Sequence, residues 1–254
     1  MSVGKNNKNI IYIMSIISVI VYYFFLYISM EWLYEHNMLT PINHLNGENV
    51  QYRFFEDVWY ASIPLFVFIL TWKKRKFYNG ILMQRKICAG LIICLAVSFI
   101  IKGDFTICGI YKLFFYLIFV GAIEEFVFRG YLYHILKYRS RKSAIVISGM
   151  LWGVFHAMMP AILQRSTLLD MLLNMVNYIG GGIVMGYLFI YIQEKSETIL
   201  IPILLHANLD YSVGHMGSVL FIIIIIYFKL NLNNVLKINN MEINFQKHHK
   251  YKKD

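Results

Sequence analysis

Three ionisable residues, Glu124, Glu125 and Arg129, lie inside an apolar run that extends from Ile107 to Leu136. At the centre of a membrane-spanning helix each such residue costs about 2.5–3.5 kcal/mol of insertion free energy, so the three together cost roughly 8–10 kcal/mol. About fifteen apolar neighbours, at roughly 0.3–0.6 kcal/mol each, offset that cost only in part. The run is therefore expected to be a helix whose charged residues face a polar interior, where the default interpretation is function.

The whole chain has the composition of a membrane protein. Of its 254 residues, 58% are hydrophobic and 17% are aromatic, and the mean hydropathy is +0.55. Several continuously apolar runs approach or reach the length that crosses a bilayer as a helix. We predict an all-α polytopic membrane protein, a bundle of about eight transmembrane helices around an internal polar cavity. The predicted spans are 9–30, 57–72, 87–101, 107–135, 143–160, 170–192, 198–214 and 216–230.

Basic residues flank these spans unevenly. With the N-terminus in the cytoplasm, 19 of the 24 lysines and arginines fall on the cytoplasmic side, four fall outside, and Arg129 lies within a span. This bias follows the positive-inside rule and places both termini in the cytoplasm. The net charge of +10 therefore predicts contact with an anionic lipid bilayer rather than with nucleic acid. The outer segment 31–57 is expected to be an acidic, aromatic loop that is either solvated or guides a substrate.

We expect one integral-membrane domain over residues 1–230, with its motifs in 118–213. Residues 231–254 are rich in Asn and Lys and are predicted to form a disordered, basic cytoplasmic tail. The frequency of Ile, Asn, Lys and Tyr is typical of an AT-rich bacterial genome, so a bacterial cell membrane is the expected location.

Cys88, Cys94 and Cys108 lie in or beside apolar runs and lack the spacing of metal ligands. They are predicted to be buried thiols. Gly182 and Gly186 form a G-x-x-x-G pattern in the sixth span, which suits close packing against another helix.

Glu125 and Arg129 are four residues apart, so on a helix they share a face and can form an ion pair. Glu124 lies about 100° round the helix axis from Glu125. The two glutamates therefore need not have the same role, because Arg129 can hold Glu125 ionised while Glu124 faces a cavity.

Two other predicted spans carry polar residues at helical spacing. One has Trp152 and His156, and the other has His206, Asn208 and Asp210. His206 and Asp210 are four residues apart, so the aspartate can fix the tautomer and orientation of the imidazole. Asn208 points elsewhere and is expected to bond a neighbouring helix. Acid and imidazole groups on three spans favour a functional cluster.

Water is the nucleophile that such a cluster can activate. A buried glutamate can act as a general base, and a second imidazole can donate to a developing oxyanion. The nearby serines, Ser148 and Ser212, are expected to bond the backbone of their own helices. The residues therefore suit hydrolysis of an amide within a membrane cavity.

At these residues the chain resembles the CAAX protease and bacteriocin-processing family, also called CPBP or Abi, of intramembrane proteases. The usual motifs of that family are E-E-x-x-x-R, F-x-x-x-H and H-x-x-x-N or H-x-x-x-D. They occur here in order at Glu124–Arg129, Trp152–His156, with tryptophan in the aromatic place, and His206–Asp210. The resemblance covers residues 118–213 and implies an eight-helix intramembrane endopeptidase.

The resemblance also implies a role for each motif residue. Glu124 and His156 would activate the attacking water, His206 and Asp210 would form the oxyanion hole, and Glu125 and Arg129 would support the site. An ionised aspartate cannot donate to an oxyanion as asparagine can. Asp210 must therefore either be protonated or act by orienting His206.

Members of this family are described both as glutamate-dependent proteases and as metalloproteases. We expect the glutamate mechanism, without a cofactor, because the H-E-x-x-H zinc-binding helix is absent. In the zinc alternative, Glu124, His156 and His206 would be the ligands. The expected partners are a peptide or membrane-protein substrate and the bilayer. A non-catalytic bacteriocin-immunity or partner-binding protein and a proton-coupled transporter stay open as other functions.

Overall fold

The structure, a computed structural model, describes residues 5–71 and 84–230. Within these ranges the chain is all helical, and each predicted span coincides with one of eight helices, so the all-α fold is confirmed. A short 3₁₀ turn, Ile42–His44, lies between the first two helices. The helices are α1 (Lys5–Glu35), α2 (Val50–Thr71), α3 (Arg85–Lys102), a composite helix from Ile107 to Leu136, α7 (Arg141–Leu163), α8 (Leu168–Ser196), α9 (Leu200–Tyr211) and a last helix, Met216–Leu230.

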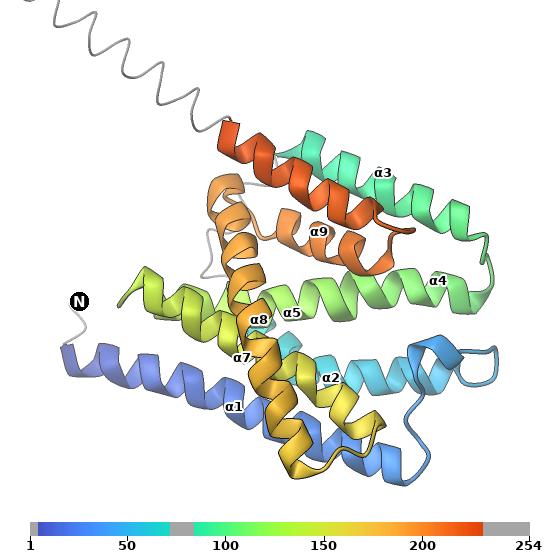
Figure 1. Cartoon of the computed structure of the whole chain (residues 1–254), viewed down its shortest axis with the longest axis horizontal. Helices are drawn as coiled ribbons and strands as arrows, with labels where there is room; N and C mark the ends of the chain where they lie inside the picture. The colour runs from blue at the N-terminus through green and yellow to red at the C-terminus, as the bar shows by residue number, and fades with distance from the viewer. Residues whose placement is uncertain (1–4, 72–83, 231–254) are drawn as a thin grey trace, which may run out of the picture.

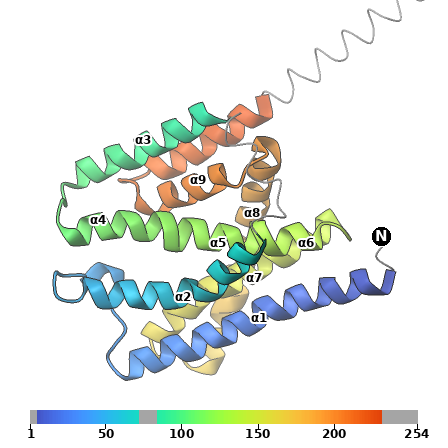
Figure 2. The same cartoon turned by 180° about the vertical axis from the view of Figure 1, so that it is seen from behind.

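The composite helix runs through the middle of the molecule. Helices α1 and α2 lie on one side of it, and α3, α9 and the last helix lie on the other (Figure 1). The view from behind shows the same layers, with α7 and α8 crossing them (Figure 2). The central position of the composite helix explains how its charged residues can be shielded from lipid by neighbouring helices.

The composite helix is π-helical on both sides of the two glutamates. Tighter α-helical segments alternate with π-helical ones, which are uncommon and frequently mark functional sites. Glu124 and Glu125 lie on the short α-helical segment between the two π-helical segments. In order, the segments are α4 (Ile107–Phe114), η4 (Phe115–Ala122, π), α5 (Ile123–Glu125), η5 (Phe126–Tyr133, π) and α6 (His134–Leu136).

Glycines allow α7 and α8 to cross with their backbones in contact. A Cβ added to Gly149 of α7 would lie 2.6 Å from Cα of Ile183, and one added to Gly182 of α8 would lie 2.7 Å from the backbone of Gly153. A Cβ at Gly186 would lie 3.0 Å from Cα of Gly149. The predicted close packing of the G-x-x-x-G pattern is confirmed, and its partner is a second pair of glycines four residues apart.

Among the residues that the structure describes, four helical stretches are long and apolar enough to cross a membrane: Asn9–Glu35, Ile107–Leu136, Arg141–Leu163 and Leu168–Ser196. Large apolar side chains, including Phe24, Ile93 and Val176, stay exposed on the outside of the bundle. Such a surface is expected where lipid rather than water surrounds the protein. The chain is therefore a membrane protein, whereas the eight-span topology and the cytoplasmic position of both termini stay predictions.

The outer segment differs from the expected loop over 31–57. Helix α1 extends to Glu35 and α2 begins at Val50, so only residues 36–49 connect them. Glu56 and Asp57 lie in α2 and are only 6% and 3% exposed, because Arg53 one turn earlier provides a positive partner. The prediction of a loop that reaches Asp57 was wrong. The predicted tail 231–254 lies outside the described residues.

The three cysteines are free thiols. The prediction that they are buried is confirmed for Cys88 and Cys108 and was wrong for Cys94, which is partly exposed.

Candidate active site

A close contact between the composite helix and α9 brings the first and third motifs together. A Cβ added to Gly121 would lie 2.9 Å from the carbonyl oxygen of Ile203 and 3.5 Å from Cβ of Ala207. Gly121 lies about one turn before Glu125, and Ile203 lies about one turn before His206. Because glycine allows the two backbones to approach this closely, His206 lies directly against Glu125.

Ser148 fixes α7 against the same central helix. Its hydroxyl donates a buried hydrogen bond of 2.9 Å to the carbonyl oxygen of Phe128 in η5. We expected Ser148 and Ser212 to bond the backbone of their own helices, and for both this was wrong. Helix α7 packs on η5, which brings the Phe128 carbonyl within reach, and Ser212 donates to the side-chain oxygen of Asn208 at 3.1 Å. Both hydroxyls are therefore engaged in structural hydrogen bonds.

Glu125 links two helices through one carboxylate oxygen. Its Oε1 lies 3.1 Å from Nη1 of Arg129 and 2.9 Å from Nδ1 of His206. Glu125 and Arg129 are fully buried and His206 is nearly so. The predicted ion pair therefore forms, and it also holds the His206 ring in place.

Aromatic rings surround the buried guanidinium of Arg129. Its central carbon lies 4.4 Å from the ring centroid of Trp152 and 5.0 Å from that of Phe189. A desolvated cation–π contact contributes about 2 kcal/mol. Removal of a charge from water costs several kcal/mol, which the rings and the ion pair with Glu125 offset in part. A Cβ at Gly186 would lie 3.9 Å from Nη2 of Arg129, an ordinary contact distance, so the guanidinium lies beside the crossing of α7 and α8.

The three motifs converge on one oxygen of Glu124. The indole nitrogen of Trp152 donates to Oε2 of Glu124 at 2.9 Å. The same oxygen lies 3.7 Å from Nε2 of His156 and 4.0 Å from Nε2 of His206. At 7% exposure Glu124 is buried, yet it lines a cavity. Glu125 instead serves the ion pair, so the two glutamates have different surroundings.

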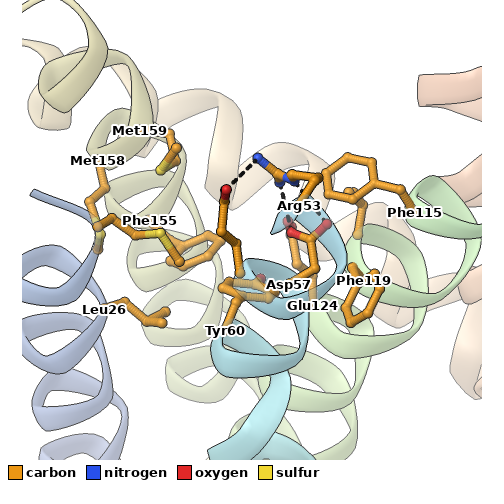
Figure 3. Close-up of a pocket in the computed structure, with 13 residues that line it drawn as sticks. Leu26, Arg53, Asp57, Tyr60, Phe115, Phe119, Glu124, Phe155, Met158 and Met159 are labelled. Carbon is orange, nitrogen blue, oxygen red and sulfur yellow. Dashed lines mark hydrogen bonds and ion pairs between the residues drawn. The ribbon is translucent and has the colours of Figure 1, made fainter. Parts of the chain in front are cut away.

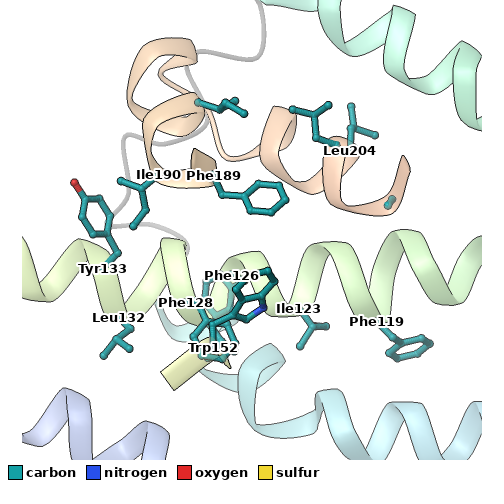
Figure 4. Packing of buried hydrophobic residues seen from close by; sticks show 14 of the residues in the cluster. Phe119, Ile123, Phe126, Phe128, Leu132, Tyr133, Trp152, Phe189, Ile190 and Leu204 are labelled. Carbon is teal, nitrogen blue, oxygen red and sulfur yellow. The ribbon is translucent and has the colours of Figure 1, made fainter. Parts of the chain in front are cut away.

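Both imidazole rings present the same nitrogen to Glu124. Nδ1 of His156 lies 2.9 Å from the carbonyl oxygen of Trp152, and Nδ1 of His206 is engaged by Glu125. The Trp152 ring also meets the two imidazoles edge to face, with centroids 4.5 Å and 5.7 Å away. Figure 4 shows Trp152 beside the composite helix, among the buried rings of this core. Trp152 thus contacts Glu124, Arg129, His156 and His206.

Asp210 lies at the outer edge of the cluster. Its Oδ2 is 3.5 Å from Nε2 of His206, and its side chain is 39% exposed. The shorter contact to the imidazole comes from Glu125 at 2.9 Å, and the role of Asp210 in orienting the ring stays a prediction. Asn208 points away, as predicted, and donates to the carbonyl oxygen of Leu91 in α3 at 3.2 Å.

A cavity of about 130 Å³ opens beside Glu124 between α1, α2, η4 and α7. Figure 3 shows apolar side chains from all four elements around it, including Leu26, Phe119 and Met158. One water needs roughly 10–15 Å³ of such volume, so the cavity has room for a water and for part of a larger molecule. Glu124 is therefore accessible to small reactants although it is buried.

Three charged residues of α2 line the same cavity and were missed from the sequence. Arg53 donates to both carboxylate oxygens of Asp57, at 2.9 Å and 2.7 Å. The hydroxyl of Tyr111 also donates to Asp57, at 2.6 Å, and Glu56 lies beside this pair. The four-residue spacing of Arg53 and Asp57 was a usable signal, since it repeats the spacing of Glu125 and Arg129.

The cluster also has the donor set of a metal site. One ligand atom each from Glu124, His156 and His206 can be chosen so that all three lie within 4.8 Å of one another. Three protein ligands with one open position are typical of catalytic zinc. The described residues therefore fit two chemistries, water activation by Glu124 itself and water activation by a metal.

A comparison with protein families found a match that spans the site. Residues 106–212 match the family model described as type II CAAX prenyl endopeptidase Rce1-like. The matched region begins just before the composite helix and ends just after α9, so it contains all three motifs. Searches of curated proteins and of solved structures found no match.

Proposed function

We propose that this chain, whose residues 106–212 match the type II CAAX prenyl endopeptidase Rce1-like family model, is an intramembrane endopeptidase in which Glu124 activates water. One observation carries the proposal. The Oε2 atom of Glu124 lies within 4.0 Å of Nε2 of both His156 and His206, beside a cavity that can hold water. Carboxylate, two imidazoles and a cavity are sufficient for hydrolysis of an amide.

Glu124 and His156 act on the water in this mechanism. Their 3.7 Å separation is too long for a direct hydrogen bond but suits a water that bonds both groups. Glu124 takes a proton from the water as its oxygen attacks the scissile carbonyl carbon. The same proton then passes to the leaving amine, so the site returns to its starting state after one turnover.

His206 stabilises the oxyanion that forms on the carbonyl oxygen. Its nitrogens lie 2.9 Å from Glu125, 3.5 Å from Asp210 and 4.0 Å from Glu124. Three carboxylates favour a positively charged imidazolium, which has a proton on Nε2 to donate as well as one for Glu125. Asp210 then contributes by supporting His206, and this role does not require it to be protonated.

Zinc is the second candidate for the activating group. Glu124, His156 and His206 would hold it, and when bound it would supply a Lewis acid that activates water. Glu125 would still hold the His206 ring, as it does in the metal-free mechanism. We favour the metal-free mechanism because His156 and His206 lie on different helices rather than on one H-E-x-x-H helix.

We propose a peptide precursor or a regulatory membrane protein as the substrate, cleaved at or near the bilayer in peptide processing or self-immunity. The support is the buried position of Glu124, which a polypeptide segment can reach only within the bundle. A non-catalytic role in immunity would need the same membrane location but no activation of water. A peptide-cleavage assay therefore distinguishes the endopeptidase from the non-catalytic immunity protein.

The test is hydrolysis by the purified full-length protein in lipid vesicles, with membrane-inserting peptides as substrates and mass spectrometry of the products. In water enriched in oxygen-18, we expect one heavy oxygen in the new carboxyl terminus. Absence of cleavage for all peptides would contradict the proposal and favour the non-catalytic role. Loss of activity in a strong chelator, with recovery on added zinc, would replace the metal-free mechanism by the zinc mechanism.

A further inference from the structure

Glu56 has unused hydrogen-bonding capacity in the cavity that Glu124 lines. Both of its oxygens accept from the backbone N–H of Thr40, at 3.1 Å and 3.2 Å, and the Thr40 side chain also bonds this carboxylate. The nearest nitrogen of Arg53 lies 3.7 Å away. An ionised carboxylate has about four acceptor sites. Glu56 is only 6% exposed. A carboxylate buried to this degree needs more hydrogen bonds than the protein provides to Glu56.

Arg53 neutralises Glu56 only in part, because its shortest contacts are made to other groups. Its guanidinium makes the two short bonds to Asp57 and donates to the carbonyl oxygen of Thr40 at 2.8 Å. The cavity lining thus holds one cation and three carboxylates, those of Glu56, Asp57 and Glu124. A buried carboxylate without a full partner is costly, so the cavity favours an occupant that brings a positive charge.

The remaining walls suit an aliphatic chain. Leu26, Met30, Phe119 and Met158 are among the apolar side chains that line the cavity. Lysine and arginine bury their methylene stems against apolar surface while the charged end reaches a polar group. A basic side chain matches both features, an apolar wall and an incompletely bonded carboxylate.

Glu56 also borders a second, larger hollow. A groove of about 1090 Å³ lies between the end of α1, the connection 36–49 and the start of α2, and Trp32, Tyr52 and Trp59 are among the residues that line it. Glu56 lines both the groove and the cavity. A polypeptide that lies in the groove can therefore direct one side chain past Glu56 toward Glu124.

We infer that the cavity is a specificity site for a lysine or arginine side chain of the substrate, with Glu56 as the residue that recognises its charge. This inference rests on the proposed endopeptidase function. It assigns the substrate a basic residue close to the scissile bond, because Glu56 and Glu124 line the same small cavity.

The experiment compares peptides that are capped at both ends, so that no terminal ammonium or carboxylate competes. Within three residues of the cleaved bond, each peptide carries lysine, norleucine or glutamate at one position. Norleucine has the lysine stem without the charge. The wild-type protein is expected to cleave one lysine peptide about tenfold faster, by kcat/KM, than its norleucine counterpart, since hydrogen bonds to charged groups contribute that much.

Variants at Glu56 test the assignment. Glu56→Gln is expected to bring the lysine-to-norleucine ratio close to one, and Glu56→Lys to favour the glutamate peptide. Glu48→Gln is the matched control, because Glu48 is exposed on the connection 36–49 that precedes α2 and its substitution changes the net charge equally. This variant should keep the wild-type ratio. An unchanged ratio in Glu56→Gln, or equal cleavage of lysine and norleucine peptides by the wild type, would overturn the inference and leave the proposed function standing.

Equilibrium binding of the same fluorescent peptides in lipid nanodiscs separates the two proposals. If the lysine peptide binds more tightly than the norleucine peptide, and Glu56→Gln abolishes the difference, the specificity site is supported even if no peptide is cleaved. Absence of cleavage would then contradict only the endopeptidase function. Equal binding of the lysine and norleucine peptides would overturn the specificity site.

Discussion

The indole N–H of Trp152 donates a 2.9 Å hydrogen bond to the carboxylate of Glu124, the group that we propose as the general base. Phenylalanine, the usual residue at this position in the family that the chain resembles, has no hydrogen-bond donor in its side chain. The hydrogen bond fixes one oxygen of Glu124. The same ring contacts both imidazoles edge to face and makes a cation–π contact with Arg129. Trp152 is therefore a positioning residue, beyond its part in the apolar core.

The variant Trp152→Phe tests this role. It keeps an aromatic ring over Arg129 but removes the donor to Glu124. A hydrogen bond to a charged group contributes about 1.5–3 kcal/mol, so we expect kcat to fall about tenfold or more. KM should change little, because Trp152 is absent from the lining of the cavity. The measurement is steady-state cleavage of one peptide.

A closer control replaces Trp152 by benzothienylalanine, which has the shape of tryptophan without the N–H. The same fall in kcat is expected. If this variant were fully active while Trp152→Phe was impaired, packing rather than the hydrogen bond would be the contribution of Trp152.

The Glu125–Arg129 pair is expected to matter for stability. Loss of one partner leaves a buried charge without a counterion, which costs about 3–5 kcal/mol. Glu125→Gln should therefore lower the thermal unfolding temperature in detergent markedly. The double variant Glu125→Gln with Arg129→Met should be more stable than Glu125→Gln alone, because no unpaired charge is left. Additive losses in the double variant would show that the two residues are not coupled.

The glycine crossing of α7 and α8 allows a matched comparison. Gly182→Ala places a methyl group within 3 Å of backbone atoms of Gly153, and such overpacking costs about 1–3 kcal/mol. A Cβ at Gly181 meets nothing within 4 Å, so Gly181→Ala should be neutral or stabilising by up to about 1 kcal/mol. Unfolding in detergent measures both variants. Equal stability of the two would contradict the close crossing.

Periodicity was enough to predict much of the site. Four-residue spacing within a single helix predicted the Glu125–Arg129 pair and its separation from Glu124, because the geometry of one helix depends only on positions along it. Continuous apolar runs predicted the eight helices for the same reason. These relationships need no knowledge of which helices are neighbours.

Contacts between helices were harder to predict. The approach of α9 to Glu125 depends on Gly121 meeting Ile203, and the Trp152 bond to Glu124 depends on the packing of α7; neither is encoded in spacing along one segment. The charges of α2 were interpreted as part of a solvated loop because Arg53, Glu56 and Asp57 made the segment polar. Their mutual pairing and burial reversed that interpretation.

The central claim is that the Glu124 carboxylate activates water. General bases contribute about 10²–10⁴-fold to rate, so Glu124→Gln should reduce kcat/KM for peptide hydrolysis by at least about a hundredfold. Membrane abundance and unfolding temperature should stay close to those of the wild type, because glutamine can still accept from Trp152. Glu35→Gln, at an exposed position, is the control and should be fully active. Full hydrolytic activity of purified Glu124→Gln would contradict the account.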